Sequence, residues 1–168
     1  MGFSGSGLYS FWGGRFERVA EESGLTSPLI SMLHVDSRGT LRVGTLDQGL
    51  FRLEGTRFIR HVEDGGLQDM PVSQVLEDAF GNIWVGTNRG IVRLRRQELD
   101  DLAVGRIASL HGNHLGREDG MLSTETSGWR IHPKGLKTRD GRLWFSTING
   151  LVVIDPAAFP VNQVPPPC

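Results

Sequence analysis

The sequence predicts an all-β chain built from repeated units of four antiparallel strands. Two observations support this prediction. First, the chain matches itself at a spacing of 42 residues, so that the run VGT at residues 43–45 recurs at residues 85–87. A third copy of the segment at residues 81–87 follows at residues 141–147. Second, each copy contains short runs of β-branched and apolar residues that end at glycine, which is typical of strands joined by tight turns.

The strands are expected in the same order within each copy. The first complete copy has four runs, at residues 30–36, 41–45, 49–55 and 57–62. The second has three, at residues 72–78, 82–87 and 90–96. Four consecutive antiparallel strands in about 42 residues are typical of a β-propeller blade. A helical solenoid of similar period is disfavoured, because glycine interrupts every candidate helix.

Residues 95–105 depart from the strand pattern. They are rich in good helix formers, and Gly105 is a suitable C-terminal stop. We therefore predict a short helical insertion near residues 96–104, where the fourth strand of this unit would otherwise begin, and we expect the strand to resume near residues 107–115. The insertion accounts for most of the 18 residues by which the spacing to the third copy exceeds 42.

These patterns divide the chain into five parts. We expect the outer strands of an incomplete blade at residues 1–22, blades at residues 23–65 and 66–119, the last blade at residues 120–160, and a proline-rich exit linker at residues 161–168. Because the first part lacks the inner strands of its blade, we interpret the chain as the C-terminal part of a larger propeller. The alternative is self-association with another copy to complete a ring.

Composition argues against several kinds of partner and chemistry. The 18 basic residues nearly balance the 19 acidic ones, so no strong field favours nucleic acid or an anionic membrane. No apolar run approaches the roughly 20 residues needed to span a bilayer, and residues 1–10 show no secretory signal. The single cysteine, Cys168, cannot form an intramolecular disulfide.

Three motifs that could carry chemistry have simpler structural explanations. The stretch at residues 2–7 lacks the final glycine of a nucleophile elbow and the Lys-Ser/Thr of a phosphate loop. His111 and His114 would face opposite sides of a strand, so they could not chelate one metal ion without a bulge. The carboxylates at residues 118–125 surround a turn-forming Asp-Gly pair. We therefore expect no catalytic residue, no metal site and no cofactor.

The stretch DAFGNIWVGTNRGIVRL at residues 78–94 resembles the two-component regulator propeller repeat. The resemblance extends upstream of this stretch and rests on Gly66, Leu67, Val72, Val75, Asp78, Gly81, Ile83, Trp84, Gly86, Thr87, Gly90 and Ile91. The earlier copy has Arg42 in place of tryptophan, and the third copy has Ser146 in place of glycine. The tail at residues 162–167 resembles the proline-rich exit from such propellers towards a β-sandwich domain.

The resemblance implies a sensor segment on the periplasmic side of a membrane receptor, such as a hybrid histidine kinase or a diguanylate cyclase receptor. It implies the remaining propeller blades and a following β-sandwich domain as partners, and no catalytic activity. It does not identify a ligand, although the known ligands of such propellers are often oligosaccharides. Two other functions stay open. One is a structural or assembly module without a small ligand, and the other, ranked last, is a lyase or glycosidase on a propeller scaffold.

A ligand-binding face can be placed by topology. In a propeller, the turn between the second and third strands lies on the same face as the loop that leads into the next blade. The candidate residues on this face are Asp47, Gln48, Asp69, Asn88, Arg89, Glu125, Trp129 and Asn149. Their mixture of hydrogen-bonding groups with one aromatic side chain suits a polar ligand such as a glycan. Several of them, including Asn88 and Asn149, are also ordinary turn residues.

Apolar residues at equivalent strand positions are expected to pack between blades. Trp84 and Trp144 recur in this way, and we assign both to packing between blades rather than to sugar stacking. The first blade would leave an apolar flank open around Leu8, Phe11 and Phe16. Open apolar faces favour self-association, so we expect the isolated chain to dimerise or aggregate.

Overall fold

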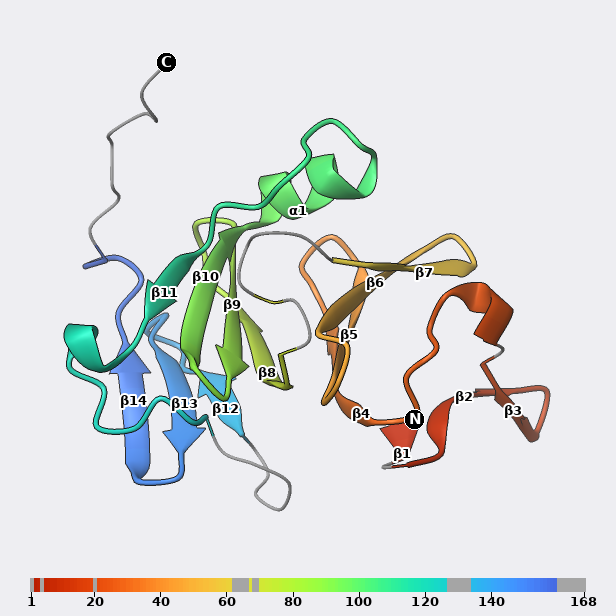
Figure 1. The fold of residues 1–168 in the computed structure, drawn as a ribbon, viewed down its shortest axis with the longest axis horizontal. Helices are drawn as coiled ribbons and strands as arrows, with labels where there is room; N and C mark the ends of the chain where they lie inside the picture. The colour runs from red at the N-terminus through yellow and green to blue at the C-terminus, as the bar shows by residue number, and fades with distance from the viewer. Residues whose placement is uncertain are drawn as a thin grey trace.

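Four antiparallel sheets make up the described part of the chain, which comprises residues 2–3, 5–19, 21–61, 67, 70–126 and 134–159 of a computed structural model (Figure 1). We name these sheets blades 1 to 4 in chain order. Blade 1 contains β1 (Gly2–Phe3), β2 (Gly7–Trp12) and β3 (Arg15–Arg18). Blade 2 contains β4 (Ile30–Val35), β5 (Leu41–Thr45), β6 (Leu50–Glu54) and β7 (Arg57–Arg60). The predicted all-β fold is confirmed.

The second half of the chain repeats this plan with one helical insertion. Blade 3 contains β8 (Val72–Glu77), β9 (Asn82–Thr87), β10 (Gly90–Arg95) and β11 (Asn113–Leu115). Blade 4 contains β12 (Gly135–Lys137), β13 (Leu143–Thr147) and β14 (Gly150–Ile154). Helix α1 (Arg96–Ala103) follows β10, and two short 3-10 helices, η1 (Glu21–Ser23) and η2 (Arg117–Asp119), lie in loops. Within the described ranges, no helix is long and apolar enough to cross a membrane.

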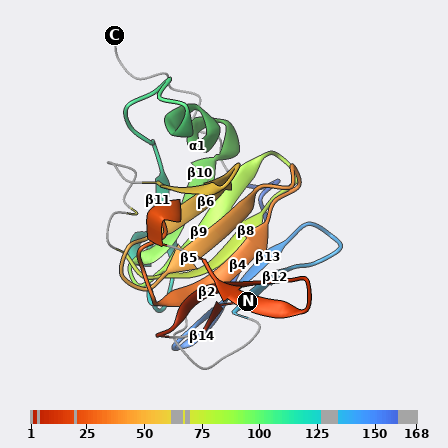
Figure 2. The same ribbon diagram turned by 90° about the vertical axis from the view of Figure 1, so that its right-hand side faces the viewer.

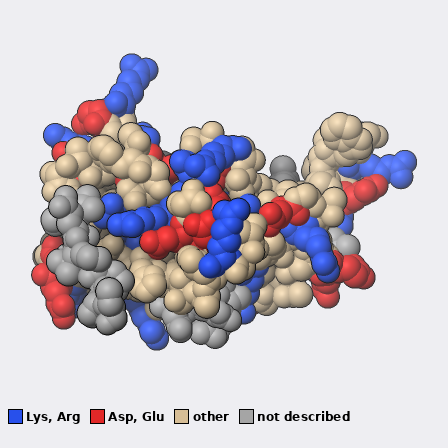
Figure 3. Space-filling model, turned by 90° about the horizontal axis from the view of Figure 1, so that it is seen from above, with Lys and Arg blue, Asp and Glu red and all other residues tan. Residues whose placement is uncertain are grey.

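The blades stand in a row with their first strands on the inside. First strand β4 lies against β8, and β8 lies against β12. In blade 1, β1 corresponds to the second strand β5 of blade 2, and it lies against β4 as β5 lies against β8. Figure 2 looks along this row and shows the sheets one behind another. The β9–β10 and β13–β14 turns both lie on the lower side of Figure 1, and α1 lies on the upper side. On the side that carries α1, basic and acidic side chains are interleaved (Figure 3).

The helical insertion is confirmed, whereas the strand that follows it is shorter than expected. Helix α1 begins at Arg96 and ends at Ala103, close to the predicted bounds. We expected the fourth strand of blade 3 near residues 107–115, but β11 begins only at Asn113. The cause is Leu110, which is buried in the core between blades 2 and 3 before pairing with β10 starts.

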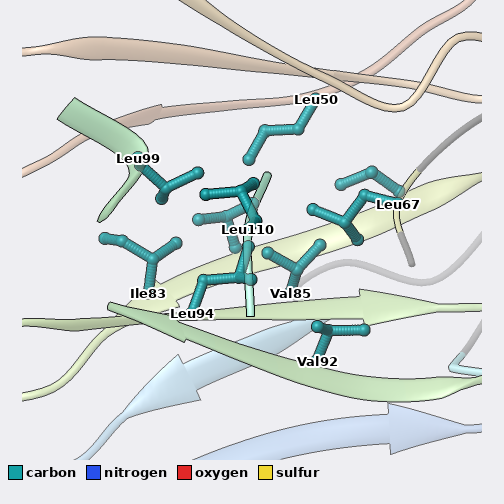
Figure 4. Packing of buried hydrophobic residues seen from close by; sticks show 10 residues of the cluster. Leu50, Leu67, Ile83, Val85, Val92, Leu94, Leu99 and Leu110 are labelled. Atoms are coloured by element: carbon teal, nitrogen blue, oxygen red, sulfur yellow. The ribbon is translucent and has the colours of Figure 1, made fainter. Parts of the chain in front are cut away.

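Among the described residues, three apolar cores lie between successive blades. Leu8, expected on an open flank, is buried in the core between blades 1 and 2 with Val43 and Phe51. The core between blades 2 and 3 is the largest, and Figure 4 shows side chains from β6, β9, β10 and α1 converging in it. It contains Leu50, Leu67, Val72, Val75, Ile83, Val85, Val92, Leu94, Leu99 and Leu110. Fully burying one such side chain contributes about 1.5–3 kcal/mol, so these interfaces dominate the stability of the row. Strand β9 is buried along its whole length, because neighbouring blades cover both of its faces.

The same hydrogen-bond pattern closes the turn between the first two strands in blades 2 and 3. The Asp78 carboxylate accepts hydrogen bonds from the backbone nitrogens of Phe80 and Asn82, at 2.8 and 2.9 Å, and from Trp84 Nε1 at 2.8 Å. In blade 2 the Asp36 carboxylate accepts the same pair of backbone bonds, at 3.0 and 2.9 Å. There Arg42 replaces tryptophan and donates to Asp36 from Nε at 3.1 Å and from Nη2 at 2.9 Å.

Blade 4 lacks this acidic residue and shows the consequence. Thr138 stands at the corresponding position, and its hydroxyl bonds Asp140 Oδ1 at 2.5 Å. The indole nitrogen of Trp144 is buried and finds no hydrogen-bond partner among the described residues. Trp84 packs as predicted, fully buried in the core between blades 3 and 4. Trp144 lies on the face of the blade 4 sheet that points away from this core, and it remains half-buried.

Glycine in the second strand allows adjacent blades to approach closely. A Cβ atom on Gly86 would lie 2.9 Å from both Ser73 Oγ and Thr126 Oγ1. A Cβ atom on Gly44 would lie 2.8 Å from Val72 Cγ1, which belongs to the next blade. These distances are shorter than a carbon side chain can occupy, and they explain why both copies have Gly-Thr at the end of this strand.

Candidate functional site

The predicted juxtaposition of turns and connecting loops is present in blade 2. The β5–β6 turn carries Asp47 and Gln48, and both contact the segment that leads into β4. Ser27 Oγ donates to Asp47 Oδ1 at 2.5 Å, and Thr26 Oγ1 donates to Gln48 Oε1 at 2.9 Å. Each side chain therefore uses part of its hydrogen-bonding capacity to hold this face together.

A similar junction forms in blade 4. The carbonyl oxygen of Glu125, just before the bridge at Thr126, accepts a hydrogen bond from the backbone nitrogen of Ile148 at 3.1 Å. This bond brings Glu125 next to the β13–β14 turn that contains Asn149. Thr126 also ties the junction to blade 3, because its hydroxyl donates to the carbonyl of Thr87 at 2.8 Å. The two candidates Glu125 and Asn149 are thus neighbours.

Asn88 and Arg89 form the two-residue β9–β10 turn and are exposed. The turn is set by Thr87, whose hydroxyl accepts the backbone N–H of Arg89 at 3.0 Å and donates to the Gly90 carbonyl at 2.9 Å. Neither the Asn88 nor the Arg89 side chain has a hydrogen bond or ion pair with the part of the chain that the structure describes. Both are available to a ligand.

Asn149 lines a shallow groove of about 320 Å³. Its walls combine apolar and polar groups, from Asp119, Gly120, Met121, Leu122, Thr147, Asn149, Leu151, Val152 and Val153. The remaining candidates, Asp69 and Trp129, lie outside the described residues. The structure therefore brings Glu125 and Asn149 together and leaves Asn88 and Arg89 on a separate turn of the same type.

The chemical motifs set aside on sequence grounds lie in structural roles. Gly7, which ends the glycine-rich stretch, donates its backbone N–H to the Pro28 carbonyl at 3.0 Å and begins β2. The Asp119 carboxylate accepts the backbone N–H of Gly116 at 2.9 Å and so caps η2. His114 lies on β11 and His111 precedes this strand. No group of three metal-ligating side chains occurs among the described residues.

A polar cluster between blades 2 and 3 was missed by sequence reasoning. Arg42 is fully buried there and pairs with Asp36. Asp100 of α1 reaches across from blade 3, so that its two carboxylate oxygens accept hydrogen bonds from Arg52 Nη1 at 2.9 Å and from Arg38 Nη1 at 3.0 Å. The replacement of tryptophan by Arg42 was the one visible signal, because a buried guanidinium needs carboxylate partners.

Burial and neighbouring charges lower the pKa values of Asp36 and His61, which both lie near Arg42. Burial would raise the pKa of Asp36, but the hydrogen bond from Thr40 and the charge of Arg42 outweigh burial and hold that pKa below its usual value. His61 is almost completely buried, and burial, followed by the charges of Arg42 and Arg52, lowers its pKa from 6.5 to about 3. Neither imidazole nitrogen has a partner among the described residues.

Comparisons with known proteins match part of the sequence to a family model and the fold to solved extracellular domains. The family model described as two-component regulator propeller matches residues 66–89. A solved structure of an extracellular domain, from a protein described as the hybrid two-component system BT3049 of B. thetaiotaomicron, has a TM-score of 0.70 and 19% identity. The match covers 93% of this chain and 19% of that one. No curated protein matches the sequence.

Two further solved structures are similar at low identity. PorZ, a surface component of the type-IX secretion system of Porphyromonas gingivalis, has a TM-score of 0.54 and 19% identity over 76% of this chain and 17% of its own. The extracellular domain of a protein described as the one-component system BT4673 of B. thetaiotaomicron has a TM-score of 0.53 and 14% identity over 89% of this chain and 25% of its own. The described part of the chain therefore consists of β-propeller blades, and residues 66–89 match the two-component regulator propeller repeat.

Proposed function

We propose that the chain is a non-catalytic, ligand-recognising segment of the extracytoplasmic sensor propeller of a two-component-type receptor. The family repeat at residues 66–89 supports this proposal, as does the shared architecture with extracellular domains described as parts of such systems. The proposed partners are further propeller blades and a β-sandwich domain of the same receptor, with the sensor on the periplasmic side of the membrane.

The observation that carries the proposal is the set of exposed polar side chains on turns between second and third strands. Asn88 and Arg89 have no partner in the described part of the chain, and Asn149 borders the groove of about 320 Å³. Amide groups both donate and accept hydrogen bonds, and a guanidinium donates from a planar fork. Together they suit a hydroxyl-rich ligand, and we propose an oligosaccharide as its class.

A glycan array first identifies oligosaccharides that bind the chain, and calorimetric titration with these sugars then tests this function. For a ligand that binds, Arg89→Ala should weaken binding at least about tenfold, because it removes donors to the ligand without disturbing a described contact. The matched control is Arg139→Ala, which removes an exposed arginine from the β12–β13 turn on the opposite side of the blades. Equal weakening by both variants, or calorimetry without binding of any glycan to the folded chain, would contradict the proposal.

An assembly module without a small ligand is the second candidate. It is favoured by the internal hydrogen bonds of Asp47 and Gln48, which tie the β5–β6 turn to Ser27 and Thr26. On this view the polar face is turn structure, and the signal passes through contacts between blades. The glycan titration distinguishes the two candidates, because an assembly module gives no heat with any sugar while keeping its thermal transition.

A further inference from the structure

The segment that follows the third strand turns back onto the preceding blade in both blade 3 and blade 4. Leu94 of β10 and Ile154 of β14 are equivalent in register, near the ends of these third strands. The fifth residue beyond each is again apolar. Leu99 is buried in the core between blades 2 and 3, and Phe159 packs on the core between blades 3 and 4. We name residues 155–159 the strap.

Side-chain contacts, and not hydrogen bonds, attach the strap to the blades. Asp155 Oδ1 accepts the backbone N–H of Ala157 at 3.0 Å, and the Asp155 carbonyl accepts that of Ala158 at 3.2 Å. Both bonds stay within the strap, and no hydrogen bond from it to another blade occurs among the described residues. The position of the strap on blade 3 therefore depends on Phe159.

Phe159 contacts two side chains of the β9–β10 hairpin of blade 3. Its ring stands edge-on to Trp84, with the ring centroids 5.3 Å apart and the planes at 89°. The guanidinium carbon of Arg93 lies 5.0 Å from the centroid of Phe159 and 5.7 Å from that of Trp84. Edge-to-face rings and a cation over a ring are both attractive at such distances. Arg93 and Trp84 are direct cross-strand partners, so the hairpin fixes their relative position.

The two contacts of Phe159 differ in how firmly blade 3 holds them. Trp84 is fully buried, and its Nε1 donates to Asp78 at 2.8 Å. Arg93 has a buried Nε without a hydrogen-bond partner among the described residues, so the two rings are the partners of its guanidinium at this point. Trp84 is therefore a fixed support, whereas the contact with Arg93 depends on the position of β10.

Blade 2 contains an arginine equivalent to Arg93. Arg52 pairs with Arg42 across β6 and β5, as Arg93 pairs with Trp84 across β10 and β9. Arg52 Nη1 donates to Asp100 of α1 at 2.9 Å. In both blades, an arginine of the third strand thus contacts the segment that follows the third strand of the next blade. The contact is an ion pair with a helix in one case, and ring contacts with a short turn in the other.

We propose that the strap is a releasable element and that β10 of blade 3 sets its position through Arg93. A short turn without hydrogen bonds to the blades opens more readily than a helix that has its own hydrogen bonds and an ion pair. Strand β10 begins at Gly90, directly after the turn of Asn88 and Arg89. One strand therefore carries both the ligand turn and the residue that holds the strap. This link to ligand recognition rests on the proposed function, whereas the strap itself does not.

Fluorine NMR of the full chain labelled with 4-fluorophenylalanine tests the proposal. Phe159→Leu identifies the Phe159 resonance by its loss. In the wild type this resonance should differ from that of the exposed Phe80, because the Trp84 ring shifts it. Arg93→Met keeps an unbranched side chain and removes the guanidinium. It should increase the open population of the strap at least about threefold, seen as movement of the Phe159 resonance towards the exposed position.

The matched control is Arg52→Met, which removes the equivalent guanidinium of blade 2 and should leave the Phe159 resonance unchanged. The resonance of Phe145, which is fully buried in the core between blades 3 and 4, should stay in place in both variants. It separates release of the strap from opening of that core. A wild-type Phe159 resonance at the exposed position overturns the proposal, as does one that Arg93→Met leaves in place or that Arg52→Met moves equally.

The reverse effect provides a second measurement, because coupling between two sites is reciprocal. Phe159→Ala should loosen the Trp84 indole, so that its Nε1 proton, which bonds Asp78, exchanges with solvent at least about threefold faster. Phe16→Ala, on the exposed strand β3, should leave this rate unchanged. Equal rates in Phe159→Ala and wild type overturn the proposal. Neither measurement uses a ligand or changes a ligand-face candidate, so a failed glycan titration leaves both outcomes intact.

Discussion

His61 lies at a position where other blades place an apolar residue. Its backbone nitrogen donates to the Leu50 carbonyl, and Val19 makes the same bond in blade 1. In blade 3, Leu115 occupies this place opposite β10. Because burial lowers the pKa of His61 to about 3, the folded chain holds a neutral imidazole that the unfolded chain protonates below about 6.5. This difference makes stability depend on pH.

We expect the free energy of unfolding to decrease as the pH falls from about 6.5 towards 3. In this window the unfolded state binds the additional proton, so stability rises with pH, by about 1.4 kcal/mol per pH unit for one such group. Denaturant unfolding at a series of pH values measures the slope. His61→Leu should remove this contribution.

His111→Leu is the control for the pH experiment, because His111 is exposed. It should keep the slope of the wild type. His34, whose pKa is also lowered by burial, adds a slope of the same sign that both variants retain. An identical pH dependence in His61→Leu and wild type would show that His61 takes up its proton without cost in the folded chain.

At the scale of elements, α1 connects two blades through Asp100. The helix packs on blade 3, while Asp100 accepts hydrogen bonds from Arg52 and Arg38 of blade 2. The next residue, Asp101, pairs instead with the exposed Arg106 in the turn that follows the same helix. Of these two adjacent carboxylates, only Asp100 forms hydrogen bonds to another blade.

Asp100→Asn should lower the free energy of unfolding by about 1.5–3 kcal/mol, the usual contribution of a hydrogen bond to a charged group. Asp101→Asn should cost less than about 1 kcal/mol, as expected of a surface ion pair. Urea unfolding of the two variants beside the wild type provides the comparison. Equal losses would mean that the bridge between blades contributes no more than the local pair.

The elements themselves could be predicted more completely than their partners. Glycine at the strand ends and the shared register located the strands, and helix formers before Gly105 located α1. The bridges from Asp100 could not be predicted, because Arg38 and Arg52 precede it by 62 and 48 residues. The start of β11 was missed for a similar reason, since only the packed core shows that Leu110 is buried before pairing begins.

The position of the candidate face could be predicted from the sequence, but which of its side chains are free to bind a ligand could not. Strand topology alone requires the β5–β6 turn to meet the segment before β4, and the bond between Ser27 and Asp47 agrees with this. Which side chains remain available depends on local geometry that the sequence does not contain. Asp47 is partly engaged, whereas Arg89, in a turn one residue shorter, is not.

At the scale of the whole molecule, protection should vary along the row of blades. Strand β9 is covered on both faces, whereas every residue of β3 is exposed. In repeat architectures stability is the sum of unit and neighbour terms, so the inner blades should open last. We expect amides of β9 to exchange at least about a hundredfold more slowly than those of β3.

Hydrogen exchange followed by mass spectrometry measures this gradient. Strand β5 provides the internal reference, because it lies in an inner blade and is largely buried. Its amides should be protected almost as well as those of β9. Uniform protection of all three strands would mean that the row unfolds as one cooperative unit, with no separate contribution from each interface.

Each inner blade packs one sheet face on the blade before it and the other on the blade after it, and this has a consequence for how the number of blades in such a chain can change. One face of the blade 3 sheet packs against blade 2, and the opposite face packs against blade 4. A tandem duplication of this unit in the gene would therefore place each new apolar face opposite one of the same kind. Asp100 of the new unit would need a compensating substitution, because Phe80 stands in blade 3 where Arg38 stands in blade 2. Lineages can lengthen or shorten the array in whole units, and the residues free to diverge are those on the turns.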